Sequence, residues 1–446
     1  MDTEKEKGGI VNVQSLESTP LPIYAKEKVD IPDGGFQAWT VVLGASLALF
    51  SSAGMVNAYG VFQNYYETTL LPSSSSSTIA LIGAIQIFLL YGLGPIVGRI
   101  FDAYGSDVLL RPGSFIAVFS MMMISLAQKD QPYQLFLSQG VLFGIGIAMI
   151  FNPALAVLGH WFRYKRAYAI GLVTGGSATG GVCFPIIIER LIPIVGFGWA
   201  VRIVAFLIMV CLIVSCITIR TRLPLSGHVS LRTAVDFDGF RDPQYVLAGI
   251  GAFLLFYAFF IPYFYIQIYA DFQGVPSRIS DYILPIMNAL NLPSRILPGL
   301  LADRFGTLNV FVPAAVVCSA LIFGLWLPSR NTAAIVAFSA LYGLFSGAFV
   351  SLLPTHIATI SPREKYGARL GSIYMLVAVA TLAGTPTAGA LLKVSDRSHF
   401  NGLIVFTGVL TVAGALTLAA AGALSRKEVQ KSHKESRESS CGSDPS

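Results

Sequence analysis

Long apolar stretches recur along this chain, and short polar or charged segments separate them. A helix rises about 1.5 Å per residue, so about twenty apolar residues cross the roughly 30 Å hydrocarbon layer of a bilayer. This pattern predicts an all-α integral membrane protein with twelve spanning helices. The predicted spans are residues 39–62, 79–98, 112–128, 134–158, 167–188, 199–219, 244–269, 280–302, 309–327, 333–357, 370–392 and 401–424.

The composition supports this prediction. Apolar residues make up 54% of the 446 residues and charged residues only 12%, and the mean hydropathy is +0.67. Soluble proteins carry about 25% charged residues, so this chain has too few to cover soluble domains. The net charge of +6 does not point to nucleic acid, because basic residues gather in the cytosolic loops of membrane proteins. We expect contact with a lipid bilayer and no nucleic-acid partner.

Lysine and arginine are distributed unequally between the two ends of the predicted spans. With twelve spans, both tails and the even-numbered connections share one side, which carries 22 of the 30 basic residues. The other side carries six, and Arg202 and Arg295 fall inside spans. Because basic loops stay in the cytosol, both termini are predicted to be cytosolic. We expect a multi-pass protein of the cell membrane, with the vacuolar membrane as the alternative.

A short pattern, GxxxDxxG, recurs at matched places after the second and the eighth predicted span, 201 residues apart, and the second copy has the full GxxxDRxG form. Its positions are Gly98, Asp102 and Gly105 in the first copy, and Gly299, Asp303, Arg304 and Gly306 in the second. We expect the first glycine to let two helices approach, the aspartate to close its helix end, and the last glycine to make a tight turn. The motif would act in gating at the cytosolic surface.

This repeat divides the chain into two halves of six spans. The predicted parts are a disordered cytosolic tail (1–38), an N-terminal half (39–219), a cytosolic loop (220–243), a C-terminal half (244–424) and a second disordered cytosolic tail (425–446). Parallel repeats of this kind place a binding site near the middle of the membrane, between the halves.

Twelve spans with this loop motif resemble the major facilitator superfamily. Within it, Pro32–Trp39 (PDGGFQAW) resembles the entry signature of the monocarboxylate porter family, especially its fungal branch. Residues 161–171 (WFRYKRAYAIG) and 175–180 (GGSATG) are similar to the fourth loop and fifth span of that family. The resemblance implies the major facilitator fold and transport of a small organic molecule by alternating access.

Ionisable residues inside a membrane are costly, so they point to a site. Arg295 lies in the eighth predicted span, about 12 Å along the helix from Asp303, and Asn291 and Asn288 share its face. This polar stripe suits an anionic or strongly polar substrate. The structural alternative is that Arg295 bonds backbone carbonyls or extends towards the cytosol. The resemblance favours the functional interpretation, because porters of this family carry an arginine at the matching place.

Two positions depart from the family. Its animal members pair this arginine with an aspartate four residues earlier and use a lysine in the first span, where this chain has Asn291 and Asn57. No carboxylate lies in the middle of a predicted span, which leaves His160 and His356 as candidates for handling protons near neutral pH. Tyr265, in a tyrosine-rich seventh span, is a further candidate for contact with an aromatic substrate.

Other classes of function fit less well. The chain has no GxxxxGK[ST] phosphate loop, and its five histidines are too scattered for HExxH or another metal-dependent active site. We expect no catalytic residue, no metal and no cofactor. The prediction is a monomeric secondary transporter that exports a small organic acid or secondary metabolite, anionic or polar aromatic, across the plasma membrane. Proton-coupled uptake of a monocarboxylate or vitamin, and a nutrient sensor derived from a transporter, remain the alternatives.

Overall fold

The structure is a computed structural model in which every described element is a helix. It describes residues 32–162, 165–222, 227, 238–361, 366–392 and 397–441, but not the side chains of residues 166–167, 303, 366–368, 397 and 426–441. Most of the predicted N-terminal tail and most of the predicted central loop therefore lie outside the described residues. Helices are expected because backbone groups inside a membrane must form their hydrogen bonds within the segment.

The first half contains six spans. Its helices are α1 (Phe36–Ser51), α2 (Ala53–Asn57), α3 (Tyr59–Tyr65), η1 (Tyr66–Leu70), α4 (Ser76–Gly92), α5 (Gly94–Tyr104), α6 (Asp107–Ile124), α7 (Pro132–Leu135), η2 (Phe136–Phe143), α8 (Gly144–Ala156), α9 (Leu158–Trp161) and α10 (Arg166–Thr218). The helices α1 to η1 form the first span, α4 and α5 the second, α6 the third, and α7 to α9 the fourth. The long α10 holds the fifth and sixth spans, because its backbone leaves helical geometry at Gly196 (φ 77°, ψ 164°).

The second half repeats this arrangement. Its helices are η4 (Asp238–Arg241), α11 (Pro243–Phe272), α12 (Ser277–Phe305), α13 (Thr307–Leu321), η5 (Ile322–Trp326), α14 (Thr332–Thr359), α15 (Tyr366–Leu391) and α16 (Arg397–Cys441). The short η4 precedes the seventh span. The ninth span combines α13 with η5, and each of the other spans is a single helix.

The described helices account for all twelve predicted spans. Nine helices or helix series are long and apolar enough to cross a membrane, and the bent pair α4 and α5 makes a tenth. The break at Gly196 divides α10 into two spans, which gives eleven. The twelfth is α12, which is 29 residues long but carries Asn288, Asn291 and Arg295 among its apolar residues. The predicted fold class is confirmed.

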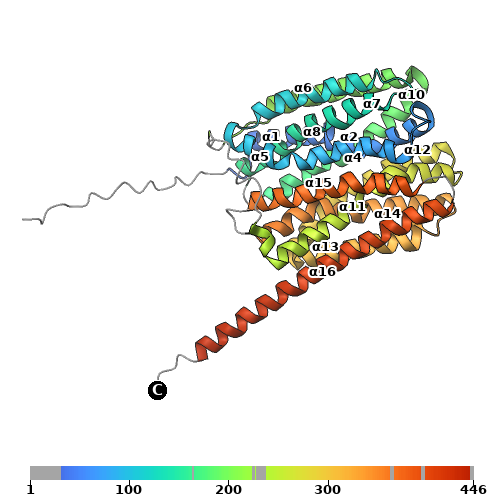
Figure 1. Ribbon diagram of the computed structural model, residues 1–446. Helices are drawn as coiled ribbons and strands as arrows, with labels where there is room; N and C mark the ends of the chain where they lie inside the picture. Colours follow the sequence, from blue (N-terminus) through green and yellow to red (C-terminus); the bar gives the residue numbers. More distant parts are fainter. Residues whose placement is uncertain are drawn as a thin grey trace, which may run out of the picture.

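The last helix is longer than predicted. α16 continues past residue 424 and ends at Cys441, so the chain is helical through most of the segment for which disorder was predicted. Lysine, glutamate and arginine are frequent in this segment and favour helix intrinsically. Figure 1 shows these last turns projecting alone beyond the bundle.

The two halves pack against each other through several pairs of helices, including α5 with α15. α4 contacts α15, α10 contacts α12, and α3 contacts α11. Figure 1 shows the helices of the first half, coloured blue to green, lying beside those of the second half, coloured yellow to red. Any side chain on these helices that points inward therefore lies at the interface between the halves, where the repeat places a binding site.

The repeated motif makes equivalent turns at one end of the bundle, which we call the motif end. Gly105 ends α5 with φ 82°, and Gly306 ends α12 with φ 87°. Their amide N–H groups donate to the carbonyl oxygens of Phe101 and Ala302, both at 2.8 Å. Both glycines have a backbone conformation that side chains rarely tolerate. The predicted tight turns are therefore present in both halves.

The two sequence signatures lie against each other at the same end. The Asp33 amide donates to the Trp161 carbonyl at 3.1 Å, and the Lys165 amide donates to the Asp33 carboxylate at 3.3 Å. The Trp39 ring meets the Phe162 ring edge-on at 5.3 Å between centroids. Segments more than a hundred residues apart thus form one structural unit, which ties the start of the first span to the start of the fifth.

Candidate functional site

The polar face of α12 is buried at the interface between the halves. Asn288, Asn291 and Arg295 have exposed fractions of 0%, 1% and 7%. Their i, i+3 and i+7 spacing places them on one side of the helix. That side packs against α10 of the first half and α14 of its own half. The predicted polar stripe is therefore inside the protein, away from the lipid.

Arg295 bonds both halves through neutral groups. Its Nε donates to Asn291 Oδ1 at 2.6 Å on its own helix. Its Nη1 donates to Ser177 Oγ at 2.6 Å and to the Thr174 carbonyl at 3.4 Å on α10. Among the described residues, no carboxylate lies within ion-pairing distance of this guanidinium. Arg295 therefore keeps an uncompensated positive charge in the centre of the molecule.

One nitrogen of the Arg295 guanidinium, Nη2, makes no described hydrogen bond. A guanidinium has five N–H donors, and the described contacts use only Nε and Nη1. Nη2 has no described acceptor, yet it is not among the buried polar atoms that lack a partner, so it still touches accessible space. Its two N–H groups are available to an acceptor on a bound molecule.

Two asparagines connect the halves beside Arg295. Asn288 Nδ2 donates to the Asn57 carbonyl at 3.4 Å, and Asn57 Nδ2 donates to the Ser177 carbonyl at 3.3 Å. Gly181 leaves room for this pair, because a Cβ there would lie 2.6 Å from Asn288 Cγ and 2.9 Å from Asn57 Cβ. Asn288 Oδ1 is buried without a partner. We call Asn57, Ser177, Asn288, Asn291 and Arg295 the central polar cluster.

The tyrosine that contacts this cluster is Tyr263, and not the Tyr265 that was selected from the same span. Its hydroxyl accepts a hydrogen bond from Asn291 Nδ2 at 2.8 Å and lies 3.4 Å from Ser346 Oγ. The selected Tyr265 lies elsewhere, with its hydroxyl donating to the Thr385 carbonyl of α15 at 3.0 Å. Two residues differ by about 200° around a helix, so these two tyrosines cannot share a face. The structure does not bring Tyr265 to the central polar cluster.

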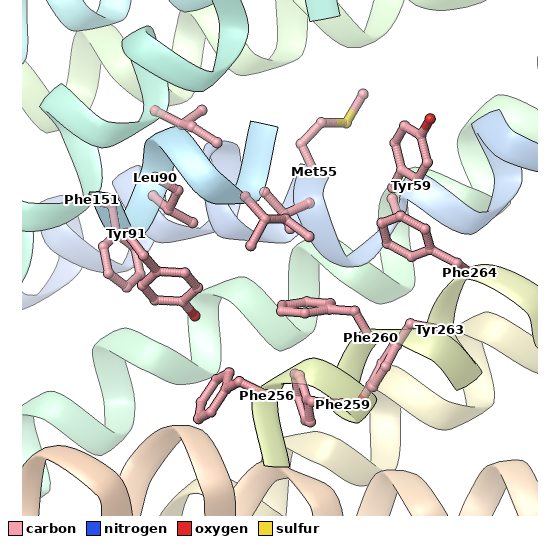
Figure 2. Packing of buried hydrophobic residues seen from close by; sticks show 14 of the residues in the cluster. Met55, Tyr59, Leu90, Tyr91, Phe151, Phe256, Phe259, Phe260, Tyr263 and Phe264 are labelled. Carbon is pink, nitrogen blue, oxygen red and sulfur yellow. The ribbon is translucent and has the colours of Figure 1, made fainter. Parts of the chain in front are cut away.

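Aromatic side chains border the cluster. Tyr91 and Tyr263 both lie close enough to Arg295 to interact with its charge. The Tyr91 ring is 6.2 Å from Phe256 and 5.4 Å from Tyr374, so it contacts both α11 and α15 of the other half. Figure 2 shows Tyr91 of the first half pointing towards the side on which Phe256 and Phe260 of α11 lie. An apolar, partly aromatic wall thus adjoins an unpaired cation.

The motif residues are separate from this cluster. Gly98, Gly105, Gly299 and Gly306 lie at the motif end, with Asp102 and Arg304 near them on α5 and α12. A Cβ at Gly98 or Gly299 would meet no atom within 4 Å. The first glycine of each copy therefore does not mark a close helix approach in this conformation, contrary to the reason that we expected. The side chain of Asp303 lies outside the described residues.

The other candidates lie apart as well. His356 is buried in α14 with Nε2 unpartnered, and His160 packs against Phe101, with 5.3 Å between ring centroids. Within the described part of the chain, no three metal-binding side chains gather. A surface cavity of about 580 Å³ opens at the motif end of the first half, and none of its lining residues belongs to the central polar cluster.

Comparison with known proteins gives a consistent result. The sequence matches the family model of the Major Facilitator Superfamily over residues 36–332 and 286–442. It is 40% identical to the MFS transporter asaE of Aspergillus flavus, covering 87% of both chains. It is 38% identical to the aspyridones efflux protein apdF of Emericella nidulans, covering 84% of this chain and 76% of the relative.

Two further comparisons extend this result. The chain is 39% identical to the fujikurins efflux protein of Gibberella fujikuroi, covering 81% of this chain and 77% of the relative. Its structure is similar to a crystal structure of a variant of the nucleoside transporter NupG, with a TM-score of 0.67 and 14% identity. That similarity covers 86% of this chain and 99% of the other, and it concerns the fold alone.

Proposed function

Because this chain belongs to the Major Facilitator Superfamily, we propose that it is a secondary transporter that exports a small organic secondary metabolite, with Arg295 as the anchor for a substrate anion. The observation that carries this proposal is a buried cation at the interface of two halves, with no described carboxylate beside it and with Nη2 uncommitted. A buried charge without a counterion is costly, and a substrate carboxylate or enolate would supply the counterion.

The surroundings of Arg295 define the class of substrate. Asn291 and Ser177 fix the guanidinium plane, so its free edge offers a directional contact to an anionic or strongly polar group. Tyr91, Phe256 and Phe260 provide an apolar wall for the rest of the molecule. The substrate that fits is a metabolite with one acidic group on a flat or apolar body. Such a molecule is larger and less polar than a short monocarboxylate.

Export rather than uptake is favoured by the relatives. Two of those that cover most of this chain are named efflux proteins for aspyridones and fujikurins. The signatures at Pro32–Trp39 and 161–171 support placement in the fungal branch of the monocarboxylate porters. Asn291 and Asn57, at the positions of that family's charged partners, argue against its proton-coupled uptake mechanism. The excess of basic residues supports a cytosolic motif end. The plasma membrane is the location that export out of the cell requires.

The test has two parts. Deleting the gene and profiling metabolites inside and outside the cells identifies the substrate, which should accumulate inside. Transport of that compound is then measured in proteoliposomes with the Arg295→Gln variant, for which we expect affinity to fall at least about 30-fold, or about 2 kcal/mol.

The matched control is Arg202→Gln. Arg202 also lies in a span, but its Nε bonds Ser125 Oγ and its guanidinium lies over the Trp199 ring, away from the cluster. We expect wild-type transport in this variant. Full activity of a folded Arg295→Gln variant would remove the anion-anchor role, and unchanged metabolite distributions in the deletion strain would remove the export function.

A further inference from the structure

The end of the bundle opposite the motif end is closed by polar contacts between the halves. Asn64 of α3 donates to Asp271 of α11 at 3.2 Å, and Ser77 of α4 donates to the Pro386 carbonyl of α15 at 2.8 Å. The most buried of these contacts joins Glu189 of α10 to Gln267 of α11, whose Nε2 donates to Glu189 Oε1. This contact is separate from the central polar cluster and has no role in the transport mechanism proposed above.

The Glu189–Gln267 contact is incomplete as it stands. Gln267 is only 3% exposed. Its Oε1 and the Glu189 Oε2 atom are both buried without a hydrogen-bond partner. Both atoms accept hydrogen bonds. An ionised Glu189 carboxylate carries no proton that it could donate to Gln267 Oε1. Leaving such buried acceptors unsatisfied destabilises the closed arrangement.

One added proton completes this arrangement. A carboxylic acid and a primary amide can form a closed pair with two hydrogen bonds, in which the amide N–H donates to one carboxyl oxygen and the acid O–H donates to the amide oxygen. The first of these bonds is present between Gln267 and Glu189. A proton on Glu189 Oε2 supplies the donor that Gln267 Oε1 lacks. Binding of this proton is the only chemical change that the step involves.

The surrounding charges do not offer a substitute for the proton. Asp271 of α11 and Asp281 of α12 act on Glu189 with the same sign of charge. Arg190 is the nearby cation, but its guanidinium donates to the Tyr282 hydroxyl on α12. Glu67 of η1 is held by Gln63 and Ser76. Among the described residues, no cation lies within 4 Å of the Glu189 carboxyl group.

We propose that Glu189 and Gln267 form a proton-binding gate, which closes the outer side of the transporter when Glu189 binds a proton and opens when it releases one. By linkage, a group that binds a proton only in the closed state makes closure take up a proton, and acid favours closure. Glu189 faces the outside when the gate is open, so the proton comes from the external medium. This inference rests on the proposed function only for alternating access and for which side is external.

The gate predicts opposite effects for two substitutions. Glu189→Gln replaces the acid by an amide that can make both hydrogen bonds with Gln267 at any pH, so it should hold the gate closed. Gln267→Leu removes both the donor and the acceptor, so it should favour the open gate at any pH. Asp281→Asn is the matched control, because it removes a neighbouring carboxylate on α12 and leaves the Glu189–Gln267 contact intact.

Distances between spin labels test this without any substrate. Lys129 and Arg330 are exposed in outer loops of opposite halves, so Lys129→Cys and Arg330→Cys provide label sites once the native cysteines are replaced by alanine. Pulsed electron–electron double resonance measures the distance between the two labels on the full chain in nanodiscs, at about pH 5 and about pH 8. With Glu189 present, the short-distance population should dominate in acid, and a longer distance should grow at the higher pH.

The variants decide the interpretation. Glu189→Gln should show the short distance at both pH values, and Gln267→Leu should show the longer distance at both. Asp281→Asn should keep a pH response, with its midpoint moved to lower pH because a neighbouring negative charge is removed. The proposal is overturned if Glu189→Gln keeps the pH response, or if the chain with Glu189 shows none. Because the readout is a distance, it stands even if no exported metabolite is found, so failure of the gate and failure of the export function are distinguishable.

Discussion

At the scale of single residues, the chemistry centres on how the two intramembrane arginines are held. Arg202 bonds a serine hydroxyl and lies 5.0 Å from the Trp199 ring centroid, the arrangement of a side chain that anchors a helix. Arg295 is held by an amide oxygen, a hydroxyl and a backbone carbonyl, all neutral. These contacts orient its guanidinium without cancelling its charge. The same residue type thus serves as an anchor in one span and is poised for a ligand in another.

An aspartate at position 291 should weaken the binding of an anionic substrate to Arg295. Asn291→Asp places a negative charge where Asn291 Oδ1 now lies, 2.6 Å from Arg295 Nε. The resulting buried ion pair would neutralise the cation and compete with a substrate anion. We expect at least about a tenfold loss of affinity, or about 1.4 kcal/mol, for an anionic substrate in proteoliposomes. The same change at the exposed Asn309 should leave affinity unaltered, and an equal loss there would contradict the argument.

Residue patterns predicted only part of this cluster. The stripe of Asn288, Asn291 and Arg295 could be predicted, because its members belong to one helix and their spacing matches its period. Ser177 could not, because its contact with Arg295 crosses 118 residues of sequence. Tyr263 and Tyr265 were indistinguishable in a span that is apolar or aromatic on all sides, since only the neighbouring helices decide which face is central.

At the scale of helices and turns, the repeated motif separates two roles of glycine. Gly105 and Gly306 have positive φ, whereas Gly98 and Gly299 lie in helices with open space where a Cβ would lie. Gly105→Ala and Gly306→Ala should each destabilise the protein by about 1–3 kcal/mol, because alanine is strained in that conformation. Thermal unfolding in detergent measures this effect.

The other two glycines of the motif provide the comparison. Gly98→Ala and Gly299→Ala should leave the stability of this conformation unchanged or raise it by up to about 1 kcal/mol, since alanine favours helix. Equal losses of stability at all four positions would show that the turns are not what distinguishes them. A loss of transport without a loss of stability at Gly98 or Gly299 would indicate a close approach in another state of the cycle.

Hydropathy predicted the elements well wherever composition alone decides them. It separated the fifth and sixth spans, although α10 runs through both, because the backbone break falls at Gly196 between two apolar stretches. The helical extension of α16 to Cys441 was not predicted, because high polarity was taken to indicate disorder while the same residues also favour helix. Polarity excludes burial more reliably than it excludes helix.

At the scale of the whole molecule, the repeat predicted two halves but not how they meet. The contacts that set their relative position join distant residues, such as Gln267 with Glu189 and Asn288 with Asn57. No periodicity reports such pairs, because each partner is an ordinary polar residue of its own helix. Glu189 directly follows the predicted fifth span (167–188), and this position does not reveal its contact with Gln267 of the other half. The contacts between the halves therefore include polar pairs that only the assembled structure displays.

The orientation of the molecule is the remaining whole-molecule prediction, and it depends on charge alone. The motif end carries 22 of the 30 basic residues in the twelve-span topology. Each basic residue near an anionic cytosolic leaflet contributes about 1 kcal/mol, so the reverse orientation is strongly disfavoured. Two single-cysteine chains test this, one keeping only Cys441 and the other carrying only Lys129→Cys. A membrane-impermeant maleimide should label Lys129→Cys on intact cells and Cys441 only after permeabilisation. Labelling of Cys441 on intact cells would show that the topology is the reverse of the predicted one. If neither cysteine is labelled until the cells are permeabilised, the protein lies in an internal membrane.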